Sequence, residues 1–170
     1  DPVNDRIAVA LQAAGYADSG RIALLDYDFN LVSYYEVGVQ PDMVTFTHNG
    51  RMILSADEGE PREGYGAGAV DPAGSVSIID LMKETVTIAG FASFDSASLA
   101  EEGVLIGKVD GELNTAALDL EPEYIAVSAD DSKAYVSLQE ANAIATVDLE
   151  TKEITAVRSM GFKDLEDAAN

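Results

Sequence analysis

The sequence predicts an all-β fold, namely a partial β-propeller of about three four-stranded antiparallel blades. The main observation is an internal repeat, because residues 41–58 align with residues 122–140 with one inserted residue. Each copy then continues into two more segments that alternate apolar and small residues as strands do. Tandem units of about 40–50 residues with four short strands each are typical of β-propellers.

The repeat also predicts where each blade lies. In chain order we expect an incomplete blade one at 6–37, blade two at 41–94, a connecting insertion at 95–120, blade three at 121–160 and a lead-in to a further blade at 161–170. Blade one is incomplete because residues 6–12 resemble the second strand of a full copy, with no first strand before them. Helical periodicity is limited to a turn near residues 96–102.

Turn residues support this division into strands. His48–Gly50 and Asp130–Ser132 fit hairpin turns between the first two strands of blades two and three. Asp26, Asp80 and Asp148 each end the third strand of a copy, where a carboxylate can accept hydrogen bonds from the following turn.

A ring of blades closes with four to eight units, so we expect this chain to be a fragment of a longer propeller. Its open sheet edges predict a homo-oligomer or pairing with the missing blades.

Composition excludes several classes of partner. Among 170 residues, 31 are acidic and 10 are basic, and the net charge is −21. Such a surface repels nucleic acids and anionic membrane faces, and no apolar stretch is long enough for a membrane span. The chain has no cysteine, which excludes disulfides and cysteine-based zinc sites. A cation or a basic partner suits this charge.

The candidate functional site is a group of carboxylates. The repeat puts Glu58 and Glu140 at the same place, just past the second strand of their blades, and puts Glu121 and Glu123 at the entry to a first strand. Neighbouring blades bring equivalent positions together. The candidate metal ligands are Asp57, Glu58, Glu60, Glu121, Glu123 and Glu140. Clustered carboxylates suit Ca²⁺, which takes six to eight oxygen ligands. The alternative is that these acids are solvated surface charges or turn caps.

Other motifs argue against catalysis. The single histidine, His48, falls in a hairpin turn, which is a poor place for the buried base of a catalytic triad. Asp26-Tyr-Asp28-Phe-Asn30 resembles the start of a calcium loop, but the glycine and glutamate needed further on are absent. Arg62 and Lys163 could bind a phosphate or a carboxylate, or could pair with nearby glutamates.

Several motifs are distinctive in combination, namely Pro41-Asp-Met-Val-Thr-Phe, Ala56-Asp-Glu-Gly-Glu-Pro-Arg62, Gly74-Ser-Val-Ser-Ile-Ile-Asp80, Leu120-Glu-Pro-Glu-Tyr-Ile-Ala-Val-Ser128, Leu138-Gln-Glu-Ala-Asn-Ala-Ile-Ala145 and Gly161-Phe-Lys-Asp164. Together they resemble the choice-of-anchor I family of exported bacterial β-propeller proteins. The family is related to sequences labelled mesenchyme-specific cell surface glycoprotein. The resemblance implies an extracellular or wall-attached protein, and it implies little about chemistry.

Two functions follow as expectations. The first is a noncatalytic binding or scaffold module, with calcium as a candidate stabilising ion and a cell-surface protein or glycan as partner. The alternative is a metal-dependent phosphoesterase, in which rim carboxylates hold a hard cation that polarises a phosphoryl oxygen.

Overall fold

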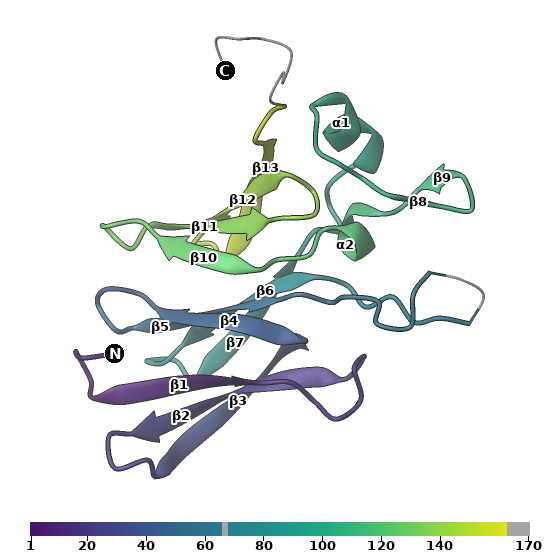
Figure 1. Cartoon of the computed structure of the whole chain (residues 1–170). Coiled ribbons are helices and arrows are strands. Elements are labelled where there is room, and N and C mark those ends of the chain that lie inside the picture. Colours follow the sequence, from purple (N-terminus) through teal and green to yellow (C-terminus); the bar gives the residue numbers. More distant parts are fainter. Residues whose placement is uncertain (66–67, 163–170) are drawn as a thin grey trace, which may run out of the picture.

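The computed structural model describes residues 1–65 and 68–162. Three antiparallel sheets follow one another in chain order, stacked side by side (Figure 1). The first contains β1 (Arg6–Leu11), β2 (Ser19–Asp26) and β3 (Leu31–Val39). The second contains β4 (Pro41–Phe46), β5 (Met52–Asp57), β6 (Ser75–Asp80) and β7 (Thr85–Gly90). The third contains β10 (Tyr124–Val127), β11 (Lys133–Leu138), β12 (Ala143–Asp148) and β13 (Glu153–Ser159).

The strand order within each sheet is the order along the chain. We refer to the three sheets as blades one, two and three. The predicted all-β partial propeller is confirmed, and its first blade has three strands where the others have four.

Side-chain capping explains where the third strands end. The Oδ1 of Asp80 accepts the amides two and three residues further on, both at 3.1 Å. Asp148 accepts the same two amides of its own turn at 3.0 and 2.9 Å. Asp26 accepts amides two and four residues on, at 3.0 and 2.8 Å. The predicted role of these three aspartates as turn caps is therefore confirmed.

Blade two is buried on both faces. Ile53 and Ile79 pack in a core shared with blade one, whereas Leu54 and Ile78 pack in a larger core shared with blade three. Neighbouring residues on a strand point to opposite faces, so all six residues of β6 are buried. This double burial holds the middle blade in a fixed position between the outer two.

A glycine–proline contact joins each blade to the next. Gly20 begins the body of β2 and lies against Pro41, the first residue of β4. Gly74 precedes β6 and lies against Pro122 and the carbonyl oxygen of Leu120, just before β10. A Cβ atom at either glycine would overlap its neighbour, so only glycine allows the blades to approach this closely.

The insertion between blades two and three is more structured than expected. It contains α1 (Ser96–Glu101), β8 (Lys108–Val109), β9 (Glu112–Leu113) and α2 (Ala116–Asp119). The Oδ1 of Asp95 caps α1 by accepting the amide of Ser98 at 2.9 Å, as N-cap aspartates do. The insertion meets blade three where the Leu105 amide donates to the Ala141 carbonyl at 2.9 Å. Within residues 1–65 and 68–162, the helices are too short and too polar to cross a bilayer.

Candidate functional site

Most of the predicted carboxylates gather at one end of blades two and three. Glu58 follows β5, Glu140 follows β11, and Glu121 and Glu123 precede β10. These connections lie at the end of the blades where the β5–β6 loop projects, on the right in Figure 1. We define the acidic rim as Glu58, Glu60, Glu121, Glu123 and Glu140.

Glu121 is the most enclosed member of the rim. Only 8% of its surface is exposed, and its sequence neighbours Leu120 and Pro122 are buried as well. It lines a cleft of about 290 Å³ together with Tyr65, Asp119 and Glu140. Burial, then the charges of Glu140, Glu58, Glu60 and Asp119, raise the pKa of Glu121 to about 7. No described residue donates a hydrogen bond or forms an ion pair with its side chain.

The other rim carboxylates repel one another in the same way. Burial and the charges of Glu60, Asp42 and Glu123 raise the pKa of Glu58. Burial, and then the charges of Glu140 and Asp42, also raise the pKa of Glu123. Like charges brought this close destabilise the fold unless a proton or another cation screens them.

Two aspartates that the sequence did not single out extend the rim. Asp119 accepts hydrogen bonds from the Gly107 amide at 2.7 Å and from Asn114 Nδ2 at 3.2 Å. Asp71 Oδ2 lies 3.5 Å from Asn114 Nδ2. Asp71 Oδ1 is buried and has no hydrogen-bond partner among the described residues. Burial, and then the charges of Glu121, Asp71 and Asp119, raise the pKa of Tyr65. Asp71 comes from the irregular β5–β6 connection and Asp119 ends the short helix α2, and no repeat marks either residue.

Asp57 lies apart from the rim. Its side chain is fully buried within blade two and accepts hydrogen bonds from Ser55, Ser75 and Ser77 at 2.8, 3.0 and 2.6 Å. The amide of Gly38 in β3 donates to the same carboxylate at 3.2 Å, which links blades one and two. Burial raises the pKa of Asp57 to about 6 against the opposing effect of these donors. A cation could reach Asp57 only by displacing these partners.

The strand register refines the repeat. Asp57 pairs with Ser75 and Leu138 pairs with Ala143, at equivalent places in blades two and three. Glu58 is therefore one residue past its strand and Glu140 is two residues past, not at the same place as the sequence alignment puts them. Both still belong to the rim, because the charges of both raise the pKa of Glu121.

Arg62, a described basic side chain near the rim, already has polar partners. Arg62 Nε donates to Gln40 Oε1 at 3.1 Å and lies 3.6 Å from a carboxylate oxygen of Glu60. The expected pairing of Arg62 with a nearby glutamate is thus confirmed. Lys163 lies outside the described residues. His48 is at the opposite end of blade two, in the β4–β5 turn.

The acidic rim is a negatively charged surface and not a preformed metal site. Across residues 1–65 and 68–162, no three Asp, Glu or His side chains converge closely enough to hold a metal ion as they stand. The arrangement can attract a cation and gain stability when one screens the repulsion. Tight chelation of Ca²⁺ would need the β5–β6 loop and the glutamates to move closer together.

Solved structures of known proteins show a similar fold. Kuenenia stuttgartiensis hydrazine synthase is similar with a TM-score of 0.59 and 13% identity, over 88% of this chain and 38% of that chain. A crystal structure of a nidogen/laminin complex has a TM-score of 0.49 and 11% identity, over 94% of this chain and 44% of that chain. The chain therefore spans less than half the length of either protein.

Sequence comparison points to one family. No curated protein matches the chain. A family model described as "Choice-of-anchor I domain" matches residues 2–170.

Proposed function

The chain belongs to the choice-of-anchor I domain family, and from that premise we propose that it is an exported, noncatalytic β-propeller module at the bacterial cell surface or wall. In this proposal the module binds a cell-surface protein or glycan through the loops of its acidic rim. Loops held at one end of a rigid sheet scaffold are where binding residues concentrate in such folds.

We further propose that Ca²⁺ binds at the rim and stabilises the module. The observation that carries this proposal is Glu121, which is nine-tenths buried in a cleft of carboxylates and has no hydrogen-bond donor among the described residues. A carboxylate that is enclosed among other carboxylates is costly to ionise unless a proton or a cation offsets the repulsion. Carboxylate oxygens are the ligands that Ca²⁺ prefers, and its flexible coordination suits loops that can adjust.

Thermal unfolding tests the calcium proposal. A ligand that binds only the folded state raises the melting temperature by mass action. We expect the purified chain to melt lowest in EDTA, and its melting temperature to rise saturably as Ca²⁺ is added. Equivalent additions of Mg²⁺ and of NaCl control for general screening. A rise no larger than these controls produce would remove calcium from the proposal.

The double variant Glu58→Gln, Glu140→Gln tests the location of the ion. It removes two rim charges and keeps the size of both side chains. We expect a weaker calcium effect in this variant than in the unmodified chain. Glu153→Gln at the start of β13, at the other end of blade three, serves as the matched control and should leave the calcium effect unchanged.

Phosphoesterase activity has less support than binding. A metal-dependent phosphoesterase needs positively charged side chains beside its carboxylates to hold the phosphoryl oxygens. Arg62 lies beside the rim, and its side chain already donates to Gln40 and lies close to the carboxylate of Glu60. If the chain does hydrolyse a phosphate ester, Arg62→Ala should abolish the activity.

A further inference from the structure

We propose that the cleft beside Glu121 binds an arginine side chain of a partner protein. This inference rests on the proposed binding role of the acidic rim, and it narrows the partner to a protein that presents an exposed arginine. The three blades differ at the end where β1, β5 and β11 finish, and the differences point to the ligand.

In blade two an arginine of the chain itself occupies this place. Gln40, the residue before β4, is 1% exposed. Its Oε1 accepts a hydrogen bond from Arg62 Nε at 3.1 Å, and Arg62 also lies 3.6 Å from a carboxylate oxygen of Glu60. Arg62 comes from the long β5–β6 connection, residues 58–74. A guanidinium group beside the residue that precedes the first strand is therefore a contact that this fold already makes.

In blade three Glu121 stands at the place of Gln40. Both residues directly precede a proline at the entry to a first strand, and the strand registers of the two blades agree with this alignment. The β11–β12 connection is short, however. It spans residues 139–142, which read Gln-Glu-Ala-Asn and include no arginine. This connection therefore supplies no counterpart of Arg62 to Glu121.

Glu121 lines a cleft of about 290 Å³ that combines negative charge with apolar side chains. Asp119 and Glu140 are its other acidic residues, and Leu105 and Ile106 are its apolar ones. Glu121 is 8% exposed, and no described residue donates a hydrogen bond to its carboxylate. A carboxylate that is enclosed in this way among other acids favours a cationic ligand.

The lining of the cleft suits a guanidinium group better than a metal ion. Across the described residues, no three acidic or histidine side chains converge closely enough to hold a metal. A guanidinium presents five N–H donors around a plane, so it can reach carboxylates that are further apart. Its aliphatic stem can lie against Leu105 and Ile106, and its planar group can stack on the ring of Tyr65, which also lines the cleft.

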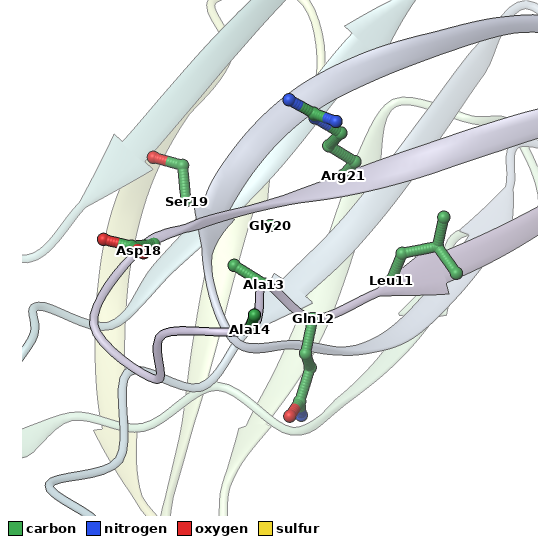
Figure 2. A pocket seen from close by; sticks show the side chains of 8 residues that line it. All are labelled: Leu11, Gln12, Ala13, Ala14, Asp18, Ser19, Gly20 and Arg21. Atoms are coloured by element: carbon green, nitrogen blue, oxygen red, sulfur yellow. The ribbon is translucent and has the colours of Figure 1, made fainter.

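The pocket at the same end of blade one lacks this clustering of acids. It is lined by Leu11–Ala14 and Asp18–Arg21, and its volume is about 460 Å³ (Figure 2). Figure 2 shows its two charged side chains, Asp18 and Arg21, which have opposite signs. A pocket that contains one acid and one base does not select a cation, so the arginine site is assigned to blade three.

Titration of the full chain with small compounds, followed by NMR, tests the proposal. The main probe is N-acetylarginine amide, whose one charge is the guanidinium group. The citrulline analogue has the same shape without the charge, and the lysine analogue has the charge without the planar group. Glucosamine presents an ammonium group on a sugar, as a glycan partner would. The buffer is at pH 8, where Glu121 is ionised, and contains EDTA so that Ca²⁺ does not compete.

We expect the arginine compound to shift the backbone amide signals of Leu105–Gly107 saturably, and the citrulline compound to cause no saturable shift. The Kd of the arginine compound should be about threefold or more below that of the lysine compound and of glucosamine. Glu121→Gln should weaken arginine binding about fivefold or more, because a guanidinium binds a carboxylate more strongly than a neutral amide. Glu153→Gln, at the other end of blade three, is the control and should bind like the unmodified chain.

Three results would overturn the proposal. These are the absence of a saturable shift, binding of the arginine compound no tighter than that of the lysine compound or glucosamine, and equal binding by Glu121→Gln and the unmodified chain. A calcium titration of the same preparation separates this inference from the calcium proposal. Ca²⁺ binding without arginine binding would remove only the arginine site, whereas arginine binding without Ca²⁺ binding would support the site and remove only calcium.

Discussion

The carboxylate of Asp131 in blade three binds the hairpin turn of blade two at His48. Its Oδ1 accepts the His48 amide at 2.8 Å and lies 2.8 Å from the ring Nδ1, while its Oδ2 accepts the Asn49 amide at 2.9 Å. The two residues are 83 positions apart in the chain. A second link at the same end joins Lys152 Nζ to Asp80 Oδ2 at 3.4 Å. These turn-to-turn contacts lie opposite the acidic rim.

We predict that Asp131→Asn lowers the free energy of unfolding by roughly 1–3 kcal/mol, since it removes charge-assisted hydrogen bonds between blades. Asparagine tolerates the positive φ of 55° at this position, so the change tests the contact and not backbone strain. Urea unfolding measures the effect.

His48→Ala is the matched comparison. It removes the ring contact but keeps the backbone amide that Asp131 accepts, so it should destabilise less than Asp131→Asn. A larger loss in His48→Ala than in Asp131→Asn would show that the carboxylate is not the main link between these turns.

The buried carboxyl group of Asp57 should make the stability of the fold depend on pH. Burial raises its folded-state pKa from 3.8 to about 6, so the folded protein binds the proton more tightly than the unfolded chain does. Stability from this group is therefore complete below pH 4 and is lost as pH rises to about 6, by an amount on the order of 3 kcal/mol.

Asp57→Asn removes this titration and keeps the shape of the side chain. We expect the difference in unfolding free energy between the two proteins to change across pH 4–6 and to be constant above that window. Guanidinium or urea unfolding at several pH values measures it. A difference that does not vary with pH would contradict a buried, titrating Asp57.

Glu121→Gln should stabilise the chain at pH 8 in EDTA, by roughly 1–2 kcal/mol, because it removes an enclosed charge that neighbouring carboxylates repel. The pKa of about 7 means that Glu121 is protonated at pH 5, so the variant should have little advantage there. Melting temperatures at the two pH values test this, with Glu153→Gln as control. Equal changes in melting temperature for Glu121→Gln and Glu153→Gln would mean that the charge of Glu121 does not destabilise the fold.

Gly74→Ala should destabilise the chain by roughly 1–3 kcal/mol or more, since its Cβ would overlap the Leu120 carbonyl and lie 2.9 Å from Pro122 Cδ. Gly90→Ala at the end of β7 is the control, because its nearest atom would be 4.0 Å away. Thermal melts compare the two. A Gly74→Ala variant as stable as Gly90→Ala would refute close packing between blades two and three.

The blades could be predicted from sequence because their information is local. Strand alternation and the capping aspartates at 26, 80 and 148 recur within each repeat, and both reflect the backbone of a single hairpin. The rim glutamates were found because they stand beside strand ends, which the repeat locates.

Contacts that depend on strand pairing and on how the loops pack could not be predicted in this way. Asp57 and Glu58 are adjacent in the sequence. Asp57 is the last residue of β5 and its side chain is buried, whereas Glu58 follows the strand and belongs to the acidic rim, so the difference depends on where β5 ends. The serines at 55, 75 and 77 around Asp57 are visible only once β5 and β6 are paired in register. Asp71 and Asp119 are brought together through the side chain of Asn114, where the β5–β6 connection lies against the insertion that contains α2.

Direct measurement of Ca²⁺ binding tests the central claim that the acidic rim binds a stabilising cation. Isothermal titration of the unmodified chain and of Glu58→Gln, Glu140→Gln at pH 7.5 is the simplest form. We expect saturable Ca²⁺ binding in the first protein and a weaker affinity in the second. Absence of saturable binding, or equal binding by both proteins, would contradict it.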